Sequence, residues 1–311
     1  MKNKKIAFLF LTLSDPNFPD IWDKYFKGNE DKYSIYIHPK NPNQVVWRRE
    51  SIIKNLVNTE WGMITRAYIE LFKAAFVNAD NFMFITVSES CVPIVSFDIL
   101  YKNLVKNNKS IIKFDYIKRY NEEVRIDQFI TTVNRTKISI PKIFIKHYAR
   151  FCLNKYDASR LLNKASNGDL DFFYKMPIGD EFFLSSIYPF NLKRVENRAI
   201  IEDNWNFTQI QLKKIKENAY KFLNAGKQKE YDILKKEYNI IAGHPKVIND
   251  TREELREIME SKAFFYRKFK KTSNIKKYWE KIIRIKDKQK MDYNDNKKIK
   301  IMTYKIILPS K

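Results

Sequence analysis

Two adjacent carboxylates, Asp180 and Glu181, have the surroundings that best suit proton-transfer chemistry. They follow Pro177-Ile178-Gly179 and open an aromatic segment that begins with Phe182-Phe183. Burial against aromatic rings raises the pKa of a carboxylate, which would make it a usable general base. Acidic residues at a helix start are also stabilised by the helix dipole, which is a purely structural explanation. The residues alone leave both interpretations open.

Polar side chains also follow two predicted strands. The strand Ser34–His38 ends on His38, and the apolar run Phe82–Val87 is followed by Ser88 and Glu89. Because ligands of open α/β sheets bind beyond the carboxyl ends of the strands, these residues are candidates for a binding rim. Each of them equally fits an ordinary loop, and His38 with Pro39 fits a turn.

The densest cationic cluster is Tyr266-Arg267-Lys268-Phe269-Lys270-Lys271. Such a cluster could neutralise a diphosphate, doing what a divalent cation does elsewhere. It could equally be the solvated face of a basic helix. The chain contains neither glycine-rich phosphate-binding fingerprint, so any phosphate site must depend on side-chain cations.

Metal-ligand patterns are weak in this sequence. Asp169-Leu170-Asp171 has the letters of a metal-binding Asp-x-Asp motif, but it falls in a predicted helix–loop connection rather than at a strand end. His38, His147 and His244 lack the spacing of metal ligands. The sequence therefore favours chemistry without a metal ion and without a bound cofactor.

Strands and helices alternate from residue 6 to about 115, which predicts an α/β layered domain. The expected elements are strand Ile6–Leu13, helix Phe18–Phe26, strand Ser34–His38, helix Trp61–Ala79 with Thr59 as a possible N-cap, strand Phe82–Val87 and helix Phe97–Val105. Further on we expect a polar excursion over Asp115–Pro141, strand Phe151–Leu153, helix Lys155–Lys164, a helical start at Phe182–Ile187, a Lys-rich helical stretch at 207–238 and a late apolar run at Ile299–Leu308.

The formal net charge of +23 admits three classes of partner: nucleic acid, an anionic membrane surface, or phosphate-bearing small molecules. Part of this excess is compositional, since Lys and Asn are abundant throughout. No nucleic-acid-binding signature occurs, so we expect no nucleic-acid partner. A basic tail at 286–311 fits a weak membrane-surface contact or simple solvation. The sequence sets no oligomeric state.

The cysteines and the N-terminal apolar run indicate the expected localisation. Cys91 and Cys152 do not form a disulfide framework, which favours a reducing compartment. The apolar run Ile6–Leu13 is short and leads into Ser14-Asp15-Pro16, so it fits a buried strand better than a signal peptide. With no apolar segment of membrane-spanning length, we expect a soluble, cytoplasmic protein, of viral or bacterial origin.

Several segments, in their order along the chain, resemble the core-2/I-branching N-acetylglucosaminyltransferase family, most closely its plant-type branch. They are Ile6–Leu13, Trp22–Gly28, Tyr33–Pro39, Glu60-Trp61-Gly62, Phe84–Pro93, Gly179–Phe183, Gly243-His244-Pro245 and Phe264–Phe269. Together they cover residues 6 to about 270, and their joint order is specific to the family.

This resemblance implies a GT-A glycosyltransferase fold with a Rossmann-like central sheet flanked by helices. One catalytic domain would cover residues 1–285, with a nucleotide-binding half to about 115 and an acceptor and catalytic half from about 116. The implied activity is inverting, metal-independent transfer from a UDP-sugar, GlcNAc first and xylose next, to a glycan or glycoprotein hydroxyl. The alternatives are a catalytically silent glycan-binding relative and a basic nucleic-acid-binding protein.

The resemblance also assigns roles to residues. Glu181 would be the general base, and Lys268 with Arg267 would neutralise the diphosphate. The other donor-binding candidates are His38, Ser88, Glu89 and Arg252, with Lys246 as the alternative to Arg252. The acceptor-binding candidates are Trp205, Arg119, Tyr120 and Asp180. The chain departs from the family pattern at Tyr148–Cys152, which lacks a Trp, and in the long stretch between Trp205 and Gly243, so the acceptor is the least transferable part.

Overall fold

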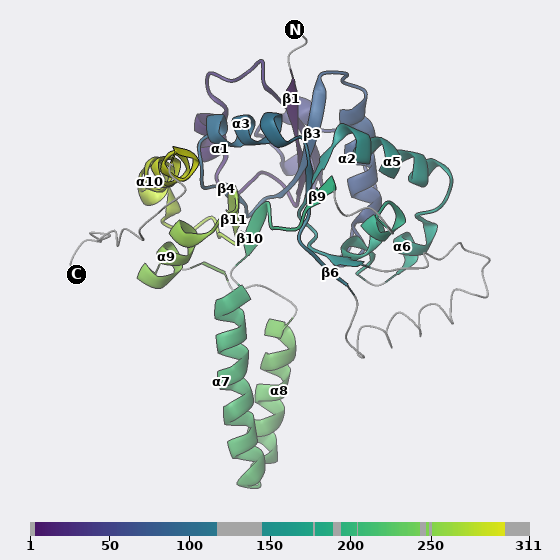
Figure 1. The fold of residues 1–311 in the computed structure, drawn as a ribbon. Helices are drawn as coiled ribbons and strands as arrows, with labels where there is room; N and C mark the ends of the chain where they lie inside the picture. Colours follow the sequence, from purple (N-terminus) through teal and green to yellow (C-terminus); the bar gives the residue numbers. More distant parts are fainter. Residues whose placement is uncertain are drawn as a thin grey trace. The chain divides into compact units, whose positions relative to one another are not determined.

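Strand β1 (Lys5–Thr12) shows why the chain forms a layered sheet, because every residue after Lys5 is buried. In the computed structural model, which describes residues 4–116, 145–176, 178–188, 194–203, 205–242, 247–248 and 251–295, this strand lies inside a six-stranded sheet (Figure 1). A strand buried on both faces needs a helical layer on each side. The predicted first strand is therefore confirmed, and so is its burial.

The sheet has the strand order β2-β1-β3-β8-β5-β9. Its members beside β1 are β2 (Tyr33–Pro39), β3 (Asn81–Ser88), β5 (Ser110–Ile111), β8 (Cys152–Asn154) and β9 (Val195–Glu196). Both β2 and β3 run parallel to β1, and β8 is antiparallel to its two neighbours, so the sheet is mostly parallel. All residues of β3 are buried, as the apolar run at Phe82–Val87 predicted.

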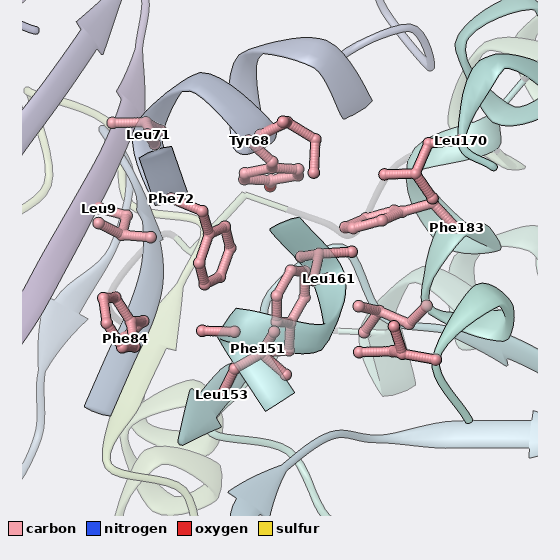
Figure 2. Close-up of a cluster of buried hydrophobic side chains, with 14 of the residues drawn as sticks. Leu9, Tyr68, Leu71, Phe72, Phe84, Phe151, Leu153, Leu161, Leu170 and Phe183 are labelled. Atoms are coloured by element: carbon pink, nitrogen blue, oxygen red, sulfur yellow. The ribbon is translucent and has the colours of Figure 1, made fainter. Parts of the chain in front are cut away.

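Alternate residues of β1 face different helices. The Phe8 ring packs against Phe26 of α1 (Pro19–Phe26), with centroids 4.9 Å apart, and against Phe97 of α3 (Phe97–Asn107). Leu9 belongs to the cluster formed with α2 (Thr65–Phe76) and α5 (Lys155–Ser166), which Figure 2 shows. Helices thus flank the sheet on both faces, which confirms the α/β prediction and is consistent with a GT-A-like fold.

Helix α2 begins later than the sequence predicts. Its first residue is Thr65, and its N-cap is Ile64 rather than Thr59. The preceding residues form a turn in which the N–H of Met63 donates to the carbonyl of Glu60, and Gly62 has φ +74°. The turn replaces the first helical turn because a glycine adopts this left-handed backbone readily.

The remaining elements around the sheet are short. They are η1 (Pro42–Gln44), η2 (Arg49–Ser51), β6 (Phe114–Tyr116), β7 (Ile145–His147), α6 (Asp171–Lys175), η4 (Gly179–Glu181) and η5 (Phe183–Ser186). β6 and β7 form an antiparallel pair. The predicted helical start at Phe182–Ile187 is the 3₁₀ turn η5, which Phe182 separates from η4.

Internal contacts divide the chain into two compact units. Unit 1 comprises Met1–Glu89 and Ser96–Ile201, and unit 2 comprises Ser90–Val95 and Glu202–Lys311. Unit 2 has a three-stranded sheet in the order β10 (Ile201–Asp203), β11 (Phe265–Arg267) and β4 (Val92–Pro93). Its helices are α7 (Trp205–Asn224), α8 (Gln228–Ala242), α9 (Arg252–Glu260) and α10 (Ile275–Asp295). The domain limits expected from the sequence stay a prediction.

Helix α9 is fixed at both ends. Thr251 and Glu254 form a capping box at its start, each bonding to the backbone N–H of the other. At its end the buried ammonium of Lys286, from α10, donates to the carbonyls of Ile258, Met259 and Ser261 at 3.1, 3.2 and 2.6 Å. Burial lowers the pKa of Lys286 to about 8. The capping box thus fixes the start of α9, where Arg252 lies, and Lys286 fixes its end.

Three of the predicted segments lie wholly or mostly outside the described residues: Asp115–Pro141, Gly243–Pro245 and Ile299–Leu308. The predicted helical stretch at 207–238 is described, and it consists of α7 and α8. No helix in the described part of the chain has both the length and the apolar character needed to cross a lipid bilayer.

Candidate functional site

Two segments far apart in the sequence meet in unit 1. A Cβ added to Gly62 would lie 3.0 Å from Cγ2 and 3.2 Å from the backbone nitrogen of Ile178. The Glu60–Met63 turn therefore packs directly on the backbone that leads into Asp180 and Glu181. Since this turn links the carboxyl end of β2 to the start of α2, the two carboxylates lie at the carboxyl edge of the sheet, where α/β folds bind ligands.

Gly179 allows the segment that carries the carboxylates to approach α6. A Cβ built on Gly179 would lie 2.1 Å from the carbonyl oxygen of Phe173, far inside any real contact. Ile178, just before it, has φ +53°, a left-handed conformation that costs a branched residue about 1 kcal/mol or more. The tight approach and the strained backbone together fix the position of the backbone that leads into Asp180 and Glu181.

Glu181 has a positively charged neighbour and access to solvent. Its Oε2 lies 3.7 Å from Nζ of Lys146 on β7, and both side chains are 35% exposed. Hydrogen bonds hold β7 against η5: the backbone N–H of Ile145 donates to Oγ of Ser185 at 2.9 Å, and this hydroxyl donates back to the carbonyl of Ile145 at 3.2 Å. A partly exposed carboxylate on a fixed backbone can meet a substrate hydroxyl.

Asp180 is buried, unlike its neighbour. Burial raises the pKa of Asp180, and the nearby guanidinium of Arg150 opposes this shift. Arg150 donates to the hydroxyl of Tyr68 and, at 2.9 Å, to the carbonyl of Ala149, which also accepts from Tyr68 at 2.7 Å. These contacts tie α2 to the segment before β8. Asp180 therefore lies beneath the surface, and its role in acceptor binding stays a prediction.

His147, next to Lys146, is a fully buried histidine packed among aromatic rings. The N–H of Leu184 donates to its Nε2 at 3.4 Å, so the neutral ring carries its proton on Nδ1, 3.0 Å from the carbonyl of Tyr148. Its ring centroid lies 5.2 Å from that of Phe183. Desolvation lowers the pKa of His147 from 6.5 to about 4. His147 is therefore uncharged at neutral pH, and it packs among the residues that support the site.

Acidification is expected to destabilise the protein through His147. Because its pKa is lower in the folded than in the unfolded chain, the unfolded chain binds more protons between pH 6.5 and 4. Folding stability therefore falls over that window, by up to about 3 kcal/mol at about 1.4 kcal/mol per pKa unit. Chemical denaturation of the wild type and of His147→Leu at several pH values measures how the free energy of unfolding of each protein depends on pH.

In the His147→Leu variant, most of this dependence of the free energy of unfolding on pH should be lost, even if the variant is less stable at neutral pH. His38, whose pKa burial also lowers, and Asp180, whose shift has the opposite sign, are unchanged in the variant, so the difference between the slopes reports His147. Equal slopes in the two proteins would contradict the assignment.

The predicted rim residues lie at strand ends, but most of them face inward. His38 is buried, and its Nε2 accepts a hydrogen bond from the N–H of Val57 at 3.0 Å, which ties the loop after β2 to the strand. Ser88 is buried at the end of β3, and Glu89 is half-buried and anchored by its carbonyl to the N–H of Asn17 at 2.8 Å. Their donor-binding roles stay predictions.

In unit 2 the segment after Glu89 joins the cationic cluster. Tyr266 pairs with Val92 across β11 and β4, and the N–H of Phe269 donates to the carbonyl of Ser90 at 3.1 Å. Lys268, half-buried, lies between these two attachments. The structure therefore brings together two of the segments that the family resemblance singled out.

Arg267 forms an ion pair with an acidic residue. Its Nη1 lies 3.4 Å from Oδ2 of Asp203, and both side chains are mostly buried. A buried ion pair of this kind fixes β11 to β10. Arg267 as a diphosphate ligand would have to share its guanidinium with Asp203, so this role stays a prediction.

Five of the predicted residues have side chains that lie outside the described set. Arg119 and Tyr120 lie outside the described residues, as does Lys246. Trp205 and Arg252 are the first residues of α7 and α9, and their side chains also lie outside the described set.

Three residues beside the carboxylates escaped the sequence analysis as site residues. Trp61 is 70% exposed in the turn that packs on Ile178, although the sequence predicted that it begins a helix. Lys146 and Arg150 approach Glu181 and Asp180 only through folding, and one lysine in a Lys-rich chain gives no local signal. The Tyr148–Cys152 departure from the family pattern was the one available hint to Arg150.

Within the described residues, no three His, Cys, Asp or Glu side chains gather as a metal site would require. Cys91 and Cys152 are both buried and unpaired with each other. The need for a metal ion is therefore a question for a chelator experiment.

Comparisons with known proteins agree with the resemblance. The model of the Core-2/I-Branching enzyme family matches residues 6–165, just over half of the chain. The rice protein named Glycosyltransferase BC10 (Oryza sativa subsp. japonica) is 27% identical over 159 residues, which make up 47% of this chain and 40% of the rice protein. The chain thus spans less than half of the length of this curated relative. The matched region contains β1 to β3, the Glu60–Met63 turn and α2, and it ends before α6 and the two carboxylates.

Proposed function

Because this chain belongs to the core-2/I-branching enzyme family, we propose that it is an inverting glycosyltransferase. Its donor is a UDP-sugar, with GlcNAc the first candidate for the sugar and xylose the second. Its acceptor is a hydroxyl group of a glycan or glycoprotein. The name of the rice relative, a glycosyltransferase, supports the same class of reaction.

The observation that carries this proposal is the position of Glu181. Its carboxylate is partly exposed at the carboxyl edge of a mostly parallel sheet, beside the ammonium of Lys146, on a backbone fixed by Gly179. A general base must be accessible to the hydroxyl that it deprotonates and held in one orientation. Asp180, the other carboxylate of the pair, is buried and does not meet the first requirement.

Transfer proceeds in one displacement under this proposal. Glu181 accepts the proton of the acceptor hydroxyl while the hydroxyl oxygen forms a bond to the anomeric carbon. The bond between that carbon and the diphosphate oxygen breaks at the same time, and UDP leaves with the electron pair. Attack on the face opposite the leaving group inverts the anomeric configuration.

Negative charge that develops on the leaving UDP needs a cationic partner. The proposal assigns this role to Lys268, with Arg267 as the second candidate. Preorganised cations stabilise a transferring phosphate group most effectively when the backbone that carries them is fixed. Lys268 meets that condition because its own carbonyl accepts from Ile248 at 3.0 Å and the next residue is bonded to Ser90.

Lys268→Ala is expected to weaken UDP binding by roughly tenfold to a hundredfold, as the loss of a charge-assisted contact would. Lys270→Ala is the matched control, because Lys270 is an exposed lysine two residues further along. Isothermal titration with UDP measures both. Equal affinities in wild type and Lys268→Ala would remove Lys268 from the donor site.

Chelation is expected to leave activity unchanged. Lysine and arginine side chains take the place of a divalent cation in this proposal, so excess EDTA should not lower the rate of UDP release. Addition of Mn²⁺ to the treated enzyme is the companion measurement. A strict requirement for Mn²⁺ would contradict a metal-independent mechanism.

The proposed function is tested by a donor screen. The purified chain is incubated with each common UDP-sugar, with and without a panel of glycan acceptors, and UDP release is measured. We expect one UDP-sugar to give acceptor-dependent release. UDP binding without release from any donor would indicate a glycan-binding relative without turnover, and no UDP binding at all would overturn the proposal.

A further inference from the structure

Exposed apolar side chains gather in one connection of unit 1, the loop between β2 and α2. Of the seven large apolar residues that are exposed in the described part of this unit, four belong to the loop: Val46, Leu56, Trp61 and Met63. Trp61 is the largest of them and is 70% exposed. Single exposed apolar residues are ordinary, but several in one loop at the ligand-binding edge of a sheet indicate a surface that another molecule covers.

A hydrogen-bonded turn holds Trp61 next to the carboxylates. Trp61 is the second residue of the Glu60–Met63 turn, and the third residue, Gly62, packs on Ile178. The carbonyl of Ile178 in turn accepts a hydrogen bond from the N–H of Glu181 at 2.9 Å. Ile178 therefore connects the turn that carries Trp61 directly with the backbone of Glu181.

The position of Trp61 is fixed by the backbone of the turn rather than by burial of its ring. Gly62 is buried and has the left-handed φ of +74°, and the N–H of Met63 closes the turn on the carbonyl of Glu60 at 3.0 Å. A surface that is fixed before a ligand arrives loses little conformational entropy when the ligand covers it. The turn thus presents an exposed aromatic ring in a place set by the rest of the fold.

We propose that Trp61 is the platform on which the acceptor sugar stacks, an inference that rests on the proposed role of Glu181 as the base. One face of a pyranose ring consists mainly of C–H bonds, which pack on an uncharged aromatic ring. The hydroxyl groups of the same sugar need polar partners, and Glu181 is one of them. Stacking on the indole ring orients the sugar while the carboxylate accepts the proton of the attacking hydroxyl.

This platform also selects the class of acceptor. The group that accepts the transferred sugar is itself a sugar residue of a glycan, and not a serine or threonine of an unglycosylated peptide. A serine or threonine side chain is short, so it would leave most of the exposed indole ring in water.

Binding of methyl glycosides to the full chain, titrated by NMR in the presence of UDP, tests this inference without requiring turnover. The panel contains the methyl glycosides of galactose, N-acetylgalactosamine, N-acetylglucosamine and mannose. We expect Trp61→Ala to weaken the binding of the preferred glycoside by at least about tenfold, as truncation of a central aromatic contact does. Trp61→Phe keeps an aromatic ring and should recover part of the affinity. The affinity for UDP should be the same in all three proteins.

Tyr156→Ala is the matched control, because Tyr156 is an aromatic residue that is 55% exposed at the opposite edge of the sheet. Its neighbour Lys155 donates to the carbonyl of Ala79, just before β3 begins, at 2.6 Å. This variant should bind the glycosides as the wild type does, and thermal unfolding checks that every variant is folded. Equal affinities of the wild type and Trp61→Ala would overturn the inference, as would a wild type that binds no glycoside or an equal loss in Tyr156→Ala.

Transfer assays separate this inference from the proposed function. With a glycan acceptor, Trp61→Ala should raise the KM for the acceptor and leave the acceptor-independent release of UDP unchanged. Transfer to a serine-containing peptide that Trp61→Ala abolishes would overturn the inference in favour of a protein acceptor. Glycosides that bind through Trp61 without transfer from any UDP-sugar would contradict the proposed function and leave the sugar platform in place.

Discussion

Glu181→Gln is expected to lower the rate of sugar transfer by roughly 10²–10⁴-fold, the usual contribution of a positioned general base. Glutamine keeps the size and shape of the side chain but cannot accept the proton of the acceptor hydroxyl. The variant should bind UDP as the wild type does, because Glu181 has no part in the proposed contact with the diphosphate. Initial rates of UDP release with acceptor, together with titration of UDP, measure both quantities.

A second carboxylate provides the control for this substitution. Glu196 on β9 is also partly exposed and is also paired with a cation, Arg198, at 2.7 Å. Glu196→Gln therefore removes a comparable ion pair away from the site, and surface ion pairs of this kind contribute only about 0–1 kcal/mol to stability. Its rate should stay close to that of the wild type. A Glu181→Gln variant with full turnover would end the assignment of the base.

Gly179→Ala is expected to have the largest effect on folding. The added methyl group would lie 2.1 Å from the carbonyl oxygen of Phe173, so the backbone of η4 or of α6 would have to move by more than 1 Å. Overpacking typically costs about 1–3 kcal/mol, and a clash with the backbone this close is expected at the upper end of that range. The displacement also carries Glu181 away from its position, so activity should fall together with stability.

Gly226→Ala separates this crowding from the ordinary cost of replacing a glycine. Gly226 has φ +69° and no atom within 4 Å of an added Cβ, so its substitution meets backbone strain alone, about 1 kcal/mol. Thermal unfolding of Gly179→Ala and Gly226→Ala compares the cost of crowding with the cost of backbone strain. A Gly179→Ala protein as stable as Gly226→Ala would show that η4 does not need the close approach to α6.

The strands of the sheet could be predicted because a strand that is buried on both faces consists of a nearly continuous run of apolar residues. Ile6–Leu13 and Phe82–Val87 are continuous apolar runs, and β1 and β3 coincide with them to within about one residue. Helix α2 was predicted to begin at Trp61, but it begins at Thr65. The turn at Gly62 precedes the helix, and a hydrophobic pattern does not record its left-handed backbone.

The surroundings of the carboxylates could be predicted only in part. Asp180 and Glu181 stood out as a pair, but the sequence could not tell which of them is buried. The charges beside them, Arg150 near Asp180 and Lys146 near Glu181, come from residues 30 and 35 positions away along the chain. The ion pair of Arg267 with Asp203 is long-range in the same way, and the cationic cluster alone did not predict it.

The central claim is that Glu181 assists a single displacement at the anomeric carbon of a UDP-sugar. Proton NMR of the product, taken before any equilibration, gives the configuration of the new glycosidic bond most directly. With an α-linked UDP-sugar as donor, we predict a β-linked product from the wild type and no product at the same enzyme concentration from Glu181→Gln. An α-linked product, or equal β-linked product from the two proteins, would contradict it.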